Sequence, residues 1–113
     1  MFEVKAYVKQ VKMEAVIDAL AQLECVTGIA VVRLHEYGHA LGTGKLTRVD
    51  MIKLEVDVAG LEDAKRAAHC IETEARTGPG HPGDGRVMIT QLHSATRIDD
   101  GAQGPAAFSS RQT

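Results

Sequence analysis

Residues 2–9 read FEVKAYVK, a stretch in which small or apolar side chains alternate with charged side chains and one tyrosine. The same alternation returns in MIKLEVDV at residues 51–58. A period of two predicts a β-strand with one buried, apolar face and one polar face. Two such strands need a second layer to cover their apolar faces, and the rest of the chain has to supply it.

Two segments with helical periodicity are candidates for that second layer. Apolar residues recur at spacings of three and four between 13 and 23, and again between 61 and 75. This spacing predicts amphipathic helices with one apolar face each. Gly60 and Gly78 flank the second pattern, as expected for a helix start and a C-terminal cap.

Two short β-branched segments, 29–34 and 87–92, predict the remaining strands. Residues 36–48 contain three glycines and are expected to form a loop at the tip of a hairpin. The order is therefore βαββαβ. It predicts an α+β, ferredoxin-like fold with a four-stranded antiparallel sheet and two helices on one face.

The second face of this sheet has no predicted cover, because two helices can pack on only one face. It is expected either to meet solvent or to be covered by copies of the same chain, and periodicity does not choose between these. The side chains expected on it are Lys5, Tyr7, Lys9, Lys53 and Glu55.

Length and charge limit the classes of function. The chain has 113 residues, which suits one domain. Lys and Arg total 13 against 15 Asp and Glu, a net charge of −2 that predicts no nucleic-acid partner. No apolar run is long enough to span a bilayer, and the N-terminus does not resemble a signal peptide. Two cysteines make no disulfide framework, so we expect a cytoplasmic protein with reduced thiols.

The segment His35-Glu36-Tyr37-Gly38-His39 matches the zinc-peptidase signature H-E-x-x-H. That chemistry needs both histidines on one helix, with the glutamate as general base. The preceding residues are β-branched, however, and on a strand the two histidines would lie about 13 Å apart at roughly 3.3 Å per residue. A small zinc metallopeptidase therefore remains the enzymatic alternative, and we expect no metal site here.

Residues 77–86 hold four of the chain's 11 glycines. The segment contains G-x-G-x-x-G, but it follows a predicted helix and precedes a strand, the reverse of the dinucleotide-binding context. Glycines allow successive backbone N–H groups to turn toward one anion, and Arg86 adds a fixed positive charge suited to phosphate. The alternative is a plain connecting loop made of turn-forming residues.

These features together resemble the PII-like signalling proteins. Thr27-Gly28 precedes the second strand, Gly38 begins the loop at the family's T-loop, and Arg97 matches a phosphate-contacting arginine. Residues 77–86 resemble the family's B-loop, Thr-Gly…Gly-Asp-Gly followed by a basic residue. The resemblance covers residues 1–100, with a short T-loop at 38–48, and leaves 101–113 as a flexible C-terminal tail.

The resemblance implies a homotrimer that binds adenine nucleotides in clefts between subunits. Gly28 and Ile29 would line the adenine pocket, and Gly38 and His39 would lie at the T-loop base. The residues expected to hold phosphates are Gly83, Asp84, Gly85 and Arg86, with Arg97 reaching in from the C-terminal segment.

The departures from the family pattern refine the expected ligand. The T-loop is much shorter than in nitrogen-regulatory members, and Asp99 replaces a second arginine, so ADP or AMP is favoured over ATP. These features are more similar to PII-like proteins associated with carboxysomes or bicarbonate transport. We therefore expect a non-catalytic sensor without cofactors. Bicarbonate is the expected second ligand, and a membrane transporter is the expected partner. The further alternative is a trimeric interaction module without a ligand.

Overall fold

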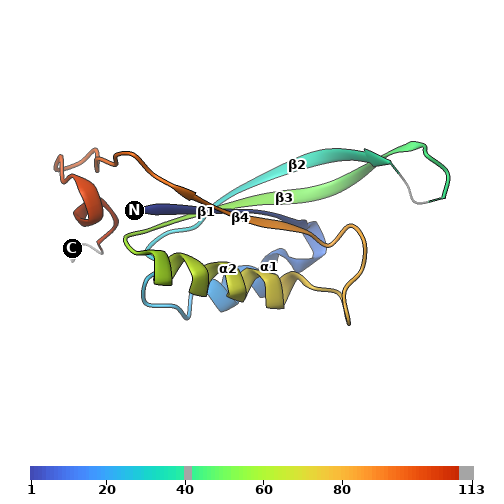
Figure 1. Ribbon diagram of the computed structural model, residues 1–113, viewed down its shortest axis with the longest axis horizontal. Coiled ribbons are helices and arrows are strands. Elements are labelled where there is room, and N and C mark those ends of the chain that lie inside the picture. The colour runs from blue at the N-terminus through green and yellow to red at the C-terminus, as the bar shows by residue number, and fades with distance from the viewer. Residues whose placement is uncertain (40–41, 110–113) are drawn as a thin grey trace.

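The computed structural model describes residues 1–39 and 42–109. Its elements follow the predicted order, with two short 3₁₀ helices added (Figure 1). Along the chain they are β1 (Phe2–Lys9), η1 (Gln10–Lys12), α1 (Met13–Leu20), β2 (Ala30–His39), β3 (Leu46–Val58), α2 (Leu61–Ala75), β4 (Gly85–Gln91) and η2 (Gly104–Phe108). No helix in the described ranges is long and apolar enough to cross a membrane.

The four strands form one antiparallel sheet in the order β2-β3-β1-β4. Both helices lie on the same face, as Figure 1 shows. The β2–β3 ladder extends well past the end of β1, and the C-terminal segment lies at the other end of the molecule (Figure 1), which is 52 Å long but only 24 by 23 Å across. This confirms the α+β, ferredoxin-like arrangement expected from the sequence.

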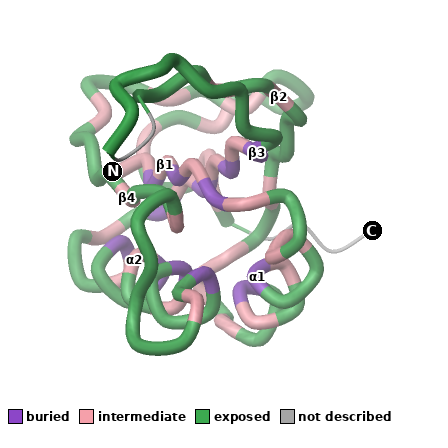
Figure 2. Tube along the Cα trace, turned by 90° about the vertical axis from the view of Figure 1, so that its right-hand side faces the viewer, coloured by how far each residue is buried: buried purple, intermediate pink, exposed green. Residues whose placement is uncertain are grey.

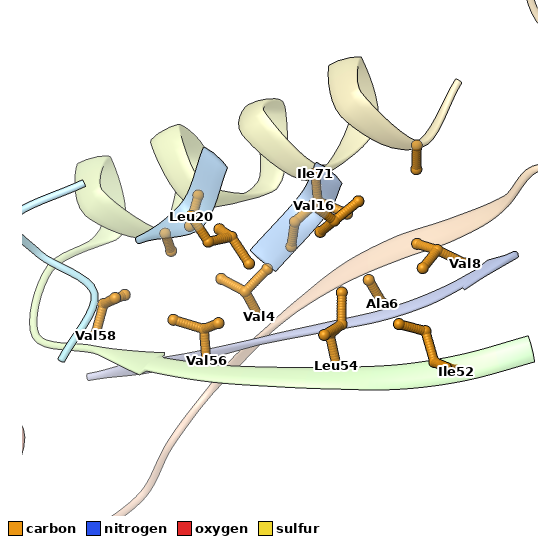
Figure 3. Packing of buried hydrophobic residues seen from close by; sticks show 13 residues of the cluster. Val4, Ala6, Val8, Val16, Leu20, Ile52, Leu54, Val56, Val58 and Ile71 are labelled. Carbon is orange, nitrogen blue, oxygen red and sulfur yellow. The ribbon is translucent and has the colours of Figure 1, made fainter. Parts of the chain in front are cut away.

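The core fills the space between the sheet and the helices (Figure 3). Alternate residues of β1 and β3 point into it, because a strand directs every second side chain to the same face. The helices contribute Val16 and Leu20 from α1 and Ile71 from α2, each fully buried. The strand residues in the core are Val4, Ala6, Val8, Ile52, Leu54, Val56 and Val58. The period-two prediction for both strands is confirmed.

The loop predicted at 36–48 is wrong in its extent. The antiparallel ladder pairs Glu36 with Val49 and continues to His39 and Leu46. Gly38 did not stop the strand, since ladder hydrogen bonds involve only backbone groups. The T-loop expected at 38–48 therefore begins and ends with strand residues, and its positions 40–41 lie outside the described residues. Residues 36–39 and 42–50 are called the distal hairpin below, and they are exposed over most of their length (Figure 2).

The segment from 101 onward, expected to be a flexible tail, contains regular structure in its described part. Residues 104–108 form η2, which has a proline in its first turn. The hydroxyl of Thr27 donates to the carbonyl oxygen of Phe108 at 3.0 Å, which ties this segment to the start of β2. Residues 110–113 of the predicted tail lie outside the described residues. α2 ends at Ala75, where the predicted helical pattern also ends, but the cap position is Arg76 in an extended conformation, so Gly78 is not the C-terminal cap.

Candidate functional site

The segment predicted as the B-loop, residues 77–86, follows α2 and runs into the first two residues of β4, and its shape depends on glycine. Four glycines there have positive φ, among them Gly83 at 94° and Gly85 at 113°. At Gly85 a side chain is also excluded by packing, since a Cβ would collide with the carbonyl oxygen of Tyr7 on β1. Glycine at this position lets the loop turn directly into β4 while β4 stays hydrogen-bonded to β1.

The Asp84 side chain holds the B-loop together through hydrogen bonds with the loop backbone. Its Oδ2 accepts hydrogen bonds from the backbone N–H of Thr77 at 3.1 Å and of His81 at 2.8 Å. Its Oδ1 lies 3.1 Å from Nζ of Lys9. Hydrogen bonds from the Thr77 side chain and backbone, then from His81, hold the pKa of Asp84 well below its ordinary value. The carboxylate is therefore charged and joins both ends of the loop to β1.

Arg86 lies on the sheet face opposite the helices, with two partners. Its guanidinium carbon is 4.3 Å from the ring centroid of Tyr7, a cation–π contact. Its Nη1 donates to both carboxylate oxygens of Glu36, at 3.1 and 3.2 Å. Glu36 belongs to β2 and Arg86 to β4, the two outer strands of the sheet. This pair links the base of the distal hairpin to the end of the B-loop.

A pocket of about 530 Å³ opens between the B-loop and the distal hairpin. It contains five of the nine residues expected to bind a nucleotide. Its lining residues are Glu36, Gly38, His39, Thr47, Val49, Met51, His81, Pro82, Gly83, Gly85 and Arg86. The structure thus brings the predicted T-loop base and the predicted phosphate loop together.

The other predicted site residues lie apart from this pocket. Gly28 and Ile29 precede β2, at the end of the sheet where Thr27 binds the C-terminal segment. Arg97 belongs to that segment, which lies at the opposite end of the molecule from the B-loop (Figure 1). Its guanidinium donates to both oxygens of Asp100, at 3.1 and 2.8 Å, and to the carbonyl oxygen of Ser109. One copy of the chain therefore carries the two halves of the predicted site at opposite ends.

The zinc-peptidase alternative lacks its structural basis. Residues 35–39 lie on β2, so His35 and His39 are not one helical turn apart. Nδ1 of His35 is 2.8 Å from Oδ1 of Asp50, while Glu36 is held by Arg86. Across residues 1–39 and 42–109, no group of three histidine, cysteine or acidic side chains is arranged to hold a metal ion.

Three residues of the site were not identified from the sequence. The sequence pattern marks Glu36 only as part of the zinc motif, and it marks Tyr7 and Lys9 only as polar residues of the open sheet face. Their roles depend on contacts between distant strands, such as the 50-residue separation of Glu36 and Arg86. The alternation in residues 2–9 did place Tyr7 and Lys9 on the same face of β1, which is the one usable signal.

Comparison with known proteins finds relatives that match nearly the whole chain. The chain is 30% identical to the nitrogen regulatory protein P-II of Azospirillum brasilense, covering 96% of this chain and 100% of the relative. It is 31% identical to nitrogen regulatory protein P-II 1 of Methanothermobacter thermautotrophicus, covering 96% and 97%. No protein-family model matches the chain.

The fold is also similar to a solved structure, that of the B. subtilis GlnK–ATP complex. The TM-score is 0.78 at 21% identity, covering 94% of this chain and 95% of that one. At this level of identity the likeness concerns the fold.

Proposed function

The chain belongs to the nitrogen regulatory P-II family, whose members are regulatory signalling proteins and not enzymes, and from this premise we propose that it senses adenine nucleotides. The pocket between the B-loop and the distal hairpin receives the phosphates. The observation that carries this proposal is the convergence of Gly83, Gly85 and Arg86 with Gly38 and His39 around one cavity.

The chemistry of this pocket suits an anion. Glycines with positive φ free the loop backbone to direct N–H groups toward a bound phosphate. Arg86 offers a permanent charge and several donors in a fixed plane, which matches phosphate oxygens. Asp84 points its carboxylate into the loop instead, so we assign it to shaping the B-loop rather than to direct phosphate contact.

The complete site forms between subunits of a homotrimer. Gly28, Ile29 and Arg97 lie too far along the molecule to complete the pocket of their own copy, and a neighbouring copy supplies them. Arg97 gives up part of its contact with Asp100 when it reaches a phosphate. The polar sheet face opposite α1 and α2 is the surface that such an assembly buries.

The sensor acts through the distal hairpin. A nucleotide at its base favours one arrangement of the T-loop over another, and a ligand shifts such an equilibrium only by binding the two arrangements with different affinity. ADP or AMP is the favoured ligand and ATP the weaker one. Bicarbonate is the proposed second ligand, and a membrane transporter in contact with the hairpin is the proposed partner.

Titration calorimetry with AMP, ADP and ATP, each with and without bicarbonate, tests this function. Arg86→Ala is expected to weaken ADP binding by about 1.5–3 kcal/mol, or roughly ten- to 150-fold, the range for a lost charged hydrogen bond. Arg66→Ala is the matched control, because Arg66 pairs with Asp63 on the surface of α2. It should leave the affinity unchanged.

Two results would contradict the proposal. If no adenine nucleotide binds to the purified protein, the chain is better described as an interaction module without a ligand. If ADP binds but Arg86→Ala binds it equally well, the phosphates lie elsewhere.

A further inference from the structure

The arginine that should bind phosphate is already occupied by a carboxylate of the same chain. Nη1 of Arg86 contacts both oxygens of Glu36, and the Glu36 side chain is 32% exposed. Glu36 also lines the pocket itself, alongside Gly38 and Gly85. A carboxylate in this position repels an entering phosphate and competes with it for the same donor.

Resting on the proposed function, we propose that Glu36 is an internal competitor of the nucleotide phosphate. It holds Arg86 while the site is empty and has to be displaced when phosphate enters. The bound ligand therefore gains the contact with Arg86 minus the contact that Glu36 gives up. A ligand therefore gains from Arg86 only if its phosphate binds the guanidinium more strongly than Glu36 does.

Tyr7 explains how Arg86 can exchange partners without losing its position. The guanidinium lies over the Tyr7 ring at 4.3 Å, on β1, and this contact does not involve Glu36. The β1–β4 ladder pairs Tyr7 directly with Arg86, so both side chains stay on one sheet face. When Glu36 leaves, the ring keeps the guanidinium aimed across the same face.

The competition favours ligands that carry a terminal phosphate. A phosphate group carries more charge than a carboxylate and offers more acceptor oxygens to a guanidinium. Adenosine, which has no phosphate, gains nothing from the release of Arg86. The expected discrimination is therefore between a nucleoside and its phosphates, and it comes from Glu36 as well as from Arg86.

Displacement of Glu36 also removes a contact that holds the distal hairpin in place. Glu36 is on β2 and Arg86 is on β4, so their contact fastens the base of the hairpin to the packed part of the sheet. A phosphate that takes Arg86 releases this fastening. By thermodynamic reciprocity, a partner that holds the hairpin with Glu36 on Arg86 lowers the affinity for the nucleotide.

Glu36→Gln tests the competition directly. It removes the charge while keeping the size of the side chain, and ADP affinity should increase about two- to five-fold, the range for loss of an exposed ion pair. Adenosine affinity should not change. Asp50→Asn is the matched control: the same charge is lost from the same hairpin, but Asp50 pairs with His35 and does not line the pocket.

The outcomes separate this inference from the proposed function. Tighter ADP binding in Glu36→Gln alone supports the inference, with thermal unfolding confirming that both variants are folded. Equal or weaker ADP binding in Glu36→Gln overturns the inference but leaves the nucleotide site standing. An equal gain in Asp50→Asn would assign the effect to net charge and also overturn the inference. Absence of ADP binding by every variant and by the unaltered protein overturns both.

Discussion

The strand β3 passes through two different environments along its 13 residues. From Met51 to Val58 buried residues recur, because β1 pairs with this half and the helices cover it. From Leu46 to Asp50 every residue is exposed, and among the described strands β2 alone pairs with it. The backbone hydrogen bonding toward β2 continues through both halves. The difference shows that pairing extends the strand whereas helix packing makes the core.

This division separates stability from recognition. The inner half supplies the apolar surface whose burial stabilises the fold. The outer half belongs to the distal hairpin and carries pocket residues such as Thr47 and Val49. A hairpin that contributes little to the core can change its position at small cost, and binding segments are typically drawn from such regions.

The largest expected effect comes from truncating one leucine in each half. Leu54 is fully buried, so Leu54→Ala should reduce the free energy of unfolding by about 2–5 kcal/mol. Leu46 is 62% exposed, and Leu46→Ala should stay within about 0.5 kcal/mol of the unaltered protein. Urea unfolding followed by circular dichroism measures both. A loss at Leu46 as large as at Leu54 would show that the hairpin is packed in solution.

A smaller effect is expected at the B-loop, where the packed body meets the hairpin. Asp84→Asn removes the charge that faces Lys9 and keeps a single acceptor oxygen for two N–H donors. Because the folded protein holds the pKa of Asp84 below its ordinary value, the charged form stabilises the fold above about pH 4. That contribution disappears as the pH falls through the lowered pKa. The variant should therefore be less stable than the original at pH 7, by less than Leu54→Ala.

The test of this reading is a series of thermal unfolding curves between pH 7 and pH 2. The difference between Asp84→Asn and the original should shrink toward the acid end. Asp18→Asn, on the exposed side of α1, is the control and should follow the original protein throughout. A difference that stays constant with pH would mean that the charge of Asp84 does not support the loop.

Local pattern was sufficient to predict the packed body. Val4, Ala6 and Val8 on one strand, and Ile52 and Leu54 on another, alternate in sequence and are buried in the structure. The reason is physical: period two and the helical spacing of three and four are each set by backbone geometry alone. The turns between α2 and β4 could also be located, because closely spaced glycines such as those of residues 78–85 are typical of backbone with positive φ.

The site and the chain ends were less predictable, because they depend on contacts across the fold. Nothing near Glu36 in the sequence indicates that its partner is Arg86, 50 residues away. The glycines of the hairpin suggested a loop, although a ladder tolerates Gly38. The C-terminal 3₁₀ helix had one local signal, Pro105 in its first turn, which was outweighed by the surrounding glycine and glutamine.

A crystal structure of the protein with ADP tests the central claim most directly. We predict the diphosphate between the B-loop and the base of the distal hairpin, with Arg86 on a phosphate oxygen and Glu36 turned away. A neighbouring copy should contribute Arg97 to the same cleft. Diphosphate bound away from Gly83 and Gly85, or Arg86 still paired with Glu36 beside a bound nucleotide, would contradict the account.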